Sequence, residues 1–170
     1  MLRRQTRSLL VTDPPTREER ERMAAGASDV QAAQTRITVG TLNTLQYGRY
    51  EAARRQVGAW VTARTGQTWE EAVKDGRGLL VIETGLRWAR IHAAVTAVET
   101  RTANRVTDEV TDWTPADWPA LADLDTFADE APGDLVDALD ELVFDLNPGL
   151  FRFGAQDADD AKKNGGISVV

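Results

Sequence analysis

Residues 78–100 read GLLVIETGLRWARIHAAVTAVET, and this stretch decides the predicted fold. Its apolar residues recur at helical spacing on two stripes rather than one. The first stripe consists of Leu79, Ile82, Leu86, Ala89, Ala93, Thr96 and Ala97, and the second of Trp88, Ile91 and Val95. Two stripes predict a central helix that is covered from two sides. Gly85 costs a helix about 1 kcal/mol relative to alanine, so its place inside this one indicates close packing by a neighbour.

Helices are predicted on both sides of this stretch. Residues 41–64 show helical spacing after a cap at Thr41, and Thr68 with Glu71 forms a capping box that opens a short helix. Thr114–Pro115 is read as another helix start. A last helix opens at Pro132 and ends at Asn147–Pro148–Gly149, where the chain cannot remain helical.

Outside the helices the signals are weaker. Residues 36–39 are predicted as a short extended piece, and residues 101–113 as a loop or a small hairpin, because Thr and Val occur there without a clean period. The expected fold is all-α: a single helical domain of about five or six helices over residues 41–147.

Three regions follow from the composition along the chain. Residues 1–35 are expected to form a charged N-terminal arm, with a helix near 14–25 that a Thr16–Glu19 capping box opens. Residues 36–153 are expected to form the helical domain. Residues 154–170, rich in Ala, Asp, Lys and Gly, are expected to be a flexible tail that is acidic and polar.

Charge divides the sequence into two halves. Residues 1–104 carry 16 Arg and Lys against 11 Asp and Glu, whereas residues 105–160 carry 2 Arg against 16 acids. Such a division is typical of a chain that works by contact, either with its own other half or with partners. Because the whole chain is acidic, with a net charge of −7 and no basic–aromatic alternation, we expect no nucleic-acid partner.

The sequence contains no recognisable catalytic set. It has no Cys, and His92 has no nucleophile, acid or metal ligand at a readable spacing, so we expect no enzyme, cofactor or metal site. Its longest apolar stretches are too short to cross a membrane or to serve as a signal peptide. The candidate residues are therefore aromatic and aliphatic ones suited to partner binding: Trp113, Trp118, Leu150, Phe151 and Phe153.

Residues 36–155 resemble the tail assembly chaperones of long-tailed, siphophage-like bacteriophages. The resemblance rests on Arg36–Leu42 leading into Gln46–Tyr50, on the helix with Trp88, and on the acidic closing helix that ends Leu146–Asn147–Pro148–Gly149–Leu150–Phe151 before a polar tail. In that family a short form and a longer form diverge by a ribosomal frameshift. Ala161–Lys162–Lys163–Asn164 is compatible with a slippery codon run near the end of a short form.

The resemblance implies a non-enzymatic function in the host cytoplasm during virion assembly. Such a chaperone binds the tape-measure protein, keeps it soluble, and recruits tail tube protein through the longer form. A helical groove would take an apolar helix, and the acidic half would keep the complex in solution. Two other classes stay open: a structural virion component, such as a connector or tail completion protein, and a small acidic regulatory interaction protein. Self-association is also left open.

Overall fold

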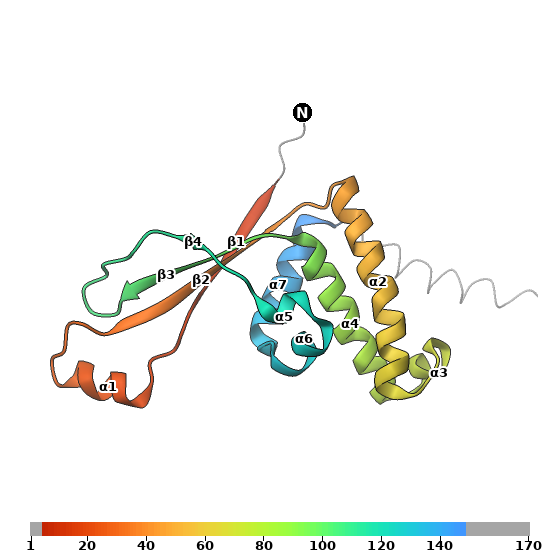
Figure 1. Cartoon of the computed structure of the whole chain (residues 1–170), viewed down its shortest axis with the longest axis horizontal. Helices are drawn as coiled ribbons and strands as arrows, with labels where there is room; N and C mark the ends of the chain where they lie inside the picture. The colour runs from red at the N-terminus through yellow and green to blue at the C-terminus, as the bar shows by residue number, and fades with distance from the viewer. Residues whose placement is uncertain (1–4, 149–170) are drawn as a thin grey trace, which may run out of the picture.

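The computed structural model describes residues 5–148 and combines helices with a sheet (Figure 1). The strands are β1 (Thr6–Thr12), β2 (Gln31–Gly40), β3 (Val95–Asn104) and β4 (Thr114–Pro115). The helices are α1 (Arg17–Ala24), α2 (Thr44–Thr65), α3 (Trp69–Lys74), α4 (Gly76–Ala94), α5 (Pro119–Ala122), α6 (Leu124–Glu130) and α7 (Gly133–Leu146). None of the helices between residues 5 and 148 combines the length and the hydropathy that a membrane span requires.

The prediction of an all-α fold is wrong. The four strands form one antiparallel sheet in the order β1-β2-β3-β4, so the fold is mixed α and β. The extended piece predicted at residues 36–39 is the end of a ten-residue strand. The central helix ends at Ala94, and residues 95–104 form β3. Thr114–Pro115 lies in β4 and does not open a helix; α5 begins at Pro119 instead.

The sheet extends away from the helices as an arm (Figure 1). We define the arm as residues 5–40 and 95–116, and the body as α2–α7. β2 and β3 form its centre, paired from Gln31 opposite Asn104 to Val39 opposite Val95, with an irregularity between Thr38 and Val39. α1 lies at the far end of the arm, between β1 and β2. β2 runs across residue 35, where the sequence suggested a boundary between two regions.

In the body, α2 and α4 lie antiparallel and very close together (Figure 1). A Cβ atom placed on Gly85 of α4 would lie 2.5 Å from Cγ1 of Val57 on α2, a distance that real Cβ atoms do not reach. The close packing predicted at Gly85 is confirmed. α3 meets α4 in the same way, because a Cβ on Gly78 would lie 2.6 Å from the carbonyl oxygen of Ala72.

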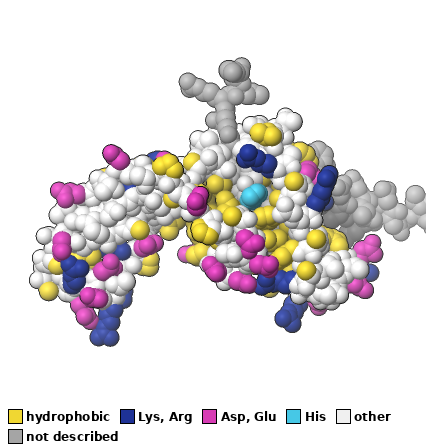
Figure 2. All heavy atoms as spheres, in the orientation of Figure 1, with side chains coloured by type: hydrophobic (Ala, Val, Ile, Leu, Met, Phe, Trp, Pro, Cys, Tyr) yellow, Lys and Arg dark blue, Asp and Glu magenta, His cyan; other side chains and the backbone are white. Residues whose placement is uncertain are grey.

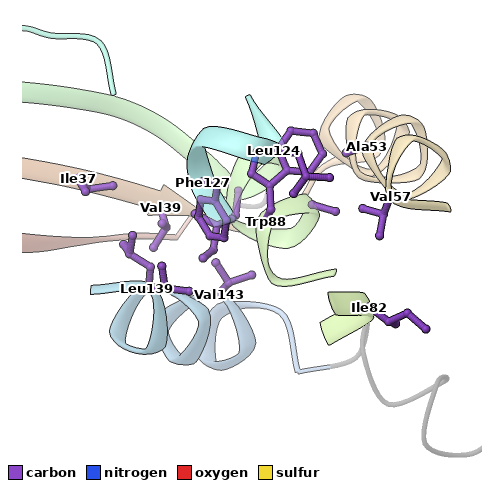
Figure 3. Close-up of a cluster of buried hydrophobic side chains, with 14 of the residues drawn as sticks. Ile37, Val39, Ala53, Val57, Ile82, Trp88, Leu124, Phe127, Leu139 and Val143 are labelled. Atoms are coloured by element: carbon purple, nitrogen blue, oxygen red, sulfur yellow. The ribbon is translucent and has the colours of Figure 1, made fainter. Parts of the chain in front are cut away.

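The core lies where the near end of the sheet meets the helices (Figure 3). Val39 of β2 points toward Leu139 of α7, and Ile37 and Val143 belong to the same cluster; all four side chains are almost fully buried. Trp88 of α4 lies in the same cluster. The cluster contains residues of α2, α4, α6 and α7, so α4 is covered from two sides as predicted. Part of its cover is the sheet, which was not predicted.

Local capping explains most helix starts. The capping boxes predicted at Thr16–Glu19 and Thr68–Glu71 are both present. α2 begins later than predicted: its cap is Asn43, whose side chain accepts a hydrogen bond from the backbone N–H of Gln46, and not Thr41. α7 ends at Leu146 as predicted.

Candidate interaction surfaces

Ion pairs join the basic first half of the chain to the acidic last part. Arg64 of α2 pairs with α6, and further pairs within residues 5–148 join α7 to β1 and α4. These are Arg7–Asp145, Arg87–Asp137, Arg90–Asp140 and, at 3.7 Å, Arg87–Asp140. The basic and acidic parts of the sequence therefore neutralise each other in part, through contacts within one chain.

Arg90 and Asp140 form the most protected of these pairs. Nε and Nη2 of Arg90 donate to the two carboxylate oxygens of Asp140, each at 2.8 Å, and the side chains are only 14% and 10% exposed. The guanidinium also lies 4.8 Å from the ring centroid of Phe144, which places an aromatic face over its charge. A bidentate pair with little access to water fixes the orientation of α7 on α4.

Arg64 links α2 to α6 through two acids. It donates to Asp129 and, at 3.0 Å, to Asp125, which also accepts a hydrogen bond from Nε1 of Trp60. The hydrogen bond to Asp129 is the main cause of the raised pKa of Arg64. This group lies at the surface, so we treat it as a link that orients α6 rather than as a large source of stability.

The structure separates the two candidate tryptophans. Trp113 is half-buried on the arm, where Arg36 and Arg101 lie 4.3 and 4.5 Å from its ring centroid. Arg36 also pairs with Glu99 at 2.7 Å, and Arg101 donates to Gln34 at 2.7 Å. Trp113 therefore covers the row of polar side chains that links β2 to β3. Both of its arginine contacts are made within this chain.

Trp118 lies on the body. Its ring is tilted against Phe127, with centroids 6.3 Å apart, and it is half-buried beside the core. His92 lies close by: its ring stacks on Trp88 at 4.9 Å, and Nδ1 is 3.1 Å from the carbonyl oxygen of Leu121. Figure 2 shows hydrophobic side chains gathered around this histidine on the body. His92 thus makes a ring stack within α4 and a hydrogen bond to the backbone of α5.

Exposed apolar side chains also occur at the corner where α3 meets α4. We define the α3–α4 corner by its four large apolar side chains, which are between 38% and 63% exposed: Trp69, Val73, Leu79 and Leu80. Sequence reasoning missed this surface and assigned Leu79 to the inward stripe of the central helix. The adjacent pair Leu79–Leu80 is the signal that could have revealed it, because adjacent helical residues cannot share one narrow face.

The remaining candidate residues, Leu150, Phe151 and Phe153, lie outside the described residues. Within residues 5–148, no group of three His, Asp or Glu side chains could hold a metal ion. A hollow of about 540 Å³ lies on the arm, between α1 and the loop after β3. Arg101, Asn104 and Arg105 line it together with Met23 and Val110.

No protein-family model, curated protein or solved structure matches this chain. Its function must therefore be inferred from its own surfaces.

Proposed function

We propose that this chain is a non-enzymatic tail assembly chaperone of a long-tailed bacteriophage. It binds the tape-measure protein in the host cytoplasm and keeps that protein soluble until tail tube protein assembles around it. The proposal retains the resemblance of residues 36–155 but not the all-α fold that was expected with it. Its partner surface is helical, and the arm is an additional element.

The observation that supports this function best is the α3–α4 corner. Four large apolar side chains are exposed there on two adjoining helices, with Leu80 63% exposed. An amphipathic helix binds such a surface by placing its own apolar face on it. A tape-measure protein is a long helical chain with an apolar surface, so it offers a partner of this chemistry.

Charge on the rest of the body suits the same role. Residues 117–148 contain ten acids and no Lys or Arg, and only part of this charge is neutralised by the ion pairs with Arg7, Arg64, Arg87 and Arg90. A net negative surface keeps a complex with an apolar partner in solution. The chaperone would thus bind with one corner and stay soluble through α5–α7.

Co-expression with the tape-measure protein tests the proposal. The wild-type chain should raise the soluble fraction of the tape-measure protein and co-purify with it, whereas Leu80→Asp should lose both effects. Val106→Asp is a matched control, because Val106 is 48% exposed but lies on the arm. Equal solubility of the tape-measure protein with and without this chain would contradict the proposal.

A structural virion component is the second candidate. The arm favours it, because a sheet continuous with a helical body makes a stiff extension suited to a permanent contact within a particle (Figure 1). Mass spectrometry of purified virions distinguishes the two functions. A chaperone is absent from finished particles, whereas a connector or completion protein remains in them.

A further inference from the structure

The two long edges of the arm differ in how they are covered. On the outer side of β3, the N–H of Thr111 donates to Thr102 and the N–H of Ala116 donates to Val98, both at 2.9 Å, and β4 pairs between them. β1 forms the opposite edge and pairs only with β2. Across residues 5–148, no backbone hydrogen bond reaches the outer side of β1.

The register shows which backbone groups of β1 point outward. The N–H of Asp13 donates to Ala33 and Gln5 accepts from Thr41, so the odd-numbered residues form the hydrogen-bonded pairs with β2. The even-numbered residues therefore turn their N–H and C=O groups to the open edge. They are Thr6, Ser8, Leu10 and Thr12.

This edge has few of the features that prevent strands from pairing. β1 contains no proline, lysine or acid, and its pairing with β2 has no bulge. Leu10, in its middle, is 52% exposed. A regular, open edge with an exposed leucine at its centre is a surface on which another strand can add.

We propose that β1 pairs antiparallel with β1 of a second copy of this chain, with the two-fold axis at Leu10. Leu10 then lies opposite Leu10 of the second copy, and Ser8 lies opposite Thr12. The outward groups of these three residues form six hydrogen bonds between the copies. The two arms become one eight-stranded antiparallel sheet, and this association does not depend on the proposed function.

Charge complementarity between Arg7 and Asp13 favours this register, and it favours a second copy of this chain as the partner. Placing the axis at Leu10 sets Arg7 of each copy opposite Asp13 of the other, on the same face of the sheet. Asp13 forms no ion pair within residues 5–148, and the side chain of Arg7 is 55% exposed although it contacts Asp145. Moving the axis to Ser8 or Leu9 would set Arg7 opposite Leu9 or Val11 instead. Opposite charges facing each other across two strands stabilise the pair.

The antiparallel arrangement also separates the acidic parts of the two copies. The ten acids of residues 117–148 lie on the body or next to it, whereas β1 carries a single charge, that of Arg7. Antiparallel strands direct the two bodies toward opposite ends of the joined sheet. Repulsion between exposed charges falls off over about 8 Å at physiological salt, so the dimer avoids most of it.

Analytical ultracentrifugation of the full chain over a wide concentration range tests the proposal. The wild type should show a monomer–dimer equilibrium, and Leu10→Pro should raise its Kd by about tenfold to a hundredfold, because both central hydrogen bonds are lost. The N–H of Leu10 takes no part in pairing with β2, so the proline leaves the arm intact. Leu10→Ala retains that N–H. It should therefore cause at most about one-tenth of the rise in Kd that Leu10→Pro causes.

A cross-linking measurement keeps the proposal testable if the proline variant does not fold. The chain has no cysteine, so Leu10→Cys introduces a single thiol. Hydrogen-bonded pairs have Cα atoms about 5.5 Å apart, which allows a disulfide, and oxidation should give a covalent dimer. Ser8→Cys should not cross-link, since its two copies lie four residues apart along the strands, about 13 Å. A wild type that stays monomeric, or equal cross-linking at both positions, would overturn the proposal.

Discussion

Replacing Gly85 with alanine tests the close contact between α2 and α4. The new Cβ would lie 2.5 Å from Cγ1 of Val57, and the other Cγ and the Cβ of Val57 lie at 3.3 and 3.4 Å, so both methyl groups of the valine crowd the added atom. Val57 is fully buried and belongs to a stiff, β-branched type. Overpacking of this kind costs about 1–3 kcal/mol, whereas the helix gains about 1 kcal/mol from losing a glycine.

We therefore expect Gly85→Ala to lower the free energy of unfolding by up to about 2 kcal/mol, the difference between overpacking and helix propensity. The melting temperature should fall by up to about 8 °C in thermal unfolding followed by circular dichroism. Gly58→Ala on α2 is the matched control, because nothing lies within 4 Å of its added Cβ. It should raise stability by about 0.5–1 kcal/mol.

The combination with Val57→Ala gives the sharper result. That change removes the two methyl groups that obstruct the site, so Gly85→Ala should stabilise the protein when Val57→Ala is already present. A double-mutant cycle of urea unfolding measures this reversal of sign. If Gly85→Ala stabilises the wild type as Gly58→Ala does, the two helices are not in contact at this point and the reasoning is refuted.

Three further predictions concern charge and the arm. Asp140→Asn should cost about 3–5 kcal/mol by removing the negative charge that the little-exposed guanidinium of Arg90 faces, whereas Asp137→Asn, at an acid that is 66% exposed, should cost about 0–1 kcal/mol in the same urea unfolding. The hydrogen bond with the backbone of Thr68 lowers the pKa of Glu71 below 4.5. The stability that the Glu71 carboxylate adds is therefore complete above that pH and is lost as the pH falls through the lowered pKa. The wild type should melt at a higher temperature than Glu71→Gln, and this difference should shrink as the pH falls from about 5 to about 3. Arg101→Met should lower stability by about 0.5–2 kcal/mol through loss of the charge over Trp113 and of the hydrogen bond to Gln34, and Trp113→Leu should remove only the part due to the ring in a double-mutant cycle.

Features that depend on neighbouring residues in the sequence were predicted well. The capping boxes at Thr16 and Thr68 are local hydrogen-bonding patterns, and both are present. The stop after Leu146 depends on Asn147–Pro148–Gly149 alone. Gly85 indicated a close neighbour because its cost to the helix needs a local reason, although nothing in the sequence named Val57 as that neighbour.

The sheet could not be predicted in the same way. Residues 95–98 read Val-Thr-Ala-Val, which continues the helical stripe of the preceding residues and is equally compatible with a strand. The choice is made by pairing with β2, more than fifty residues earlier, and a single sequence does not show such a partner. The α3–α4 corner was missed for a related reason: helix was predicted correctly for residues 78–94, but which stripe faces the core depends on where the sheet and α7 lie.

The placement of α2–α4 between two paired strands has a consequence for the order of folding. β2 ends at Gly40 and β3 begins at Val95, immediately after α4, so the central ladder closes over residues 41–94. Closing a flexible loop of that length costs about 3–4 kcal/mol of chain entropy. Once α2 and α4 pack antiparallel, however, the end of β2 and the start of β3 already lie side by side (Figure 1). We therefore expect the hairpin of α2 and α4 to form first, from short-range contacts, and to hold the adjoining ends of β2 and β3 together. Pairing of β2 with β3 then extends from the body toward α1, and the tip of the arm becomes ordered last.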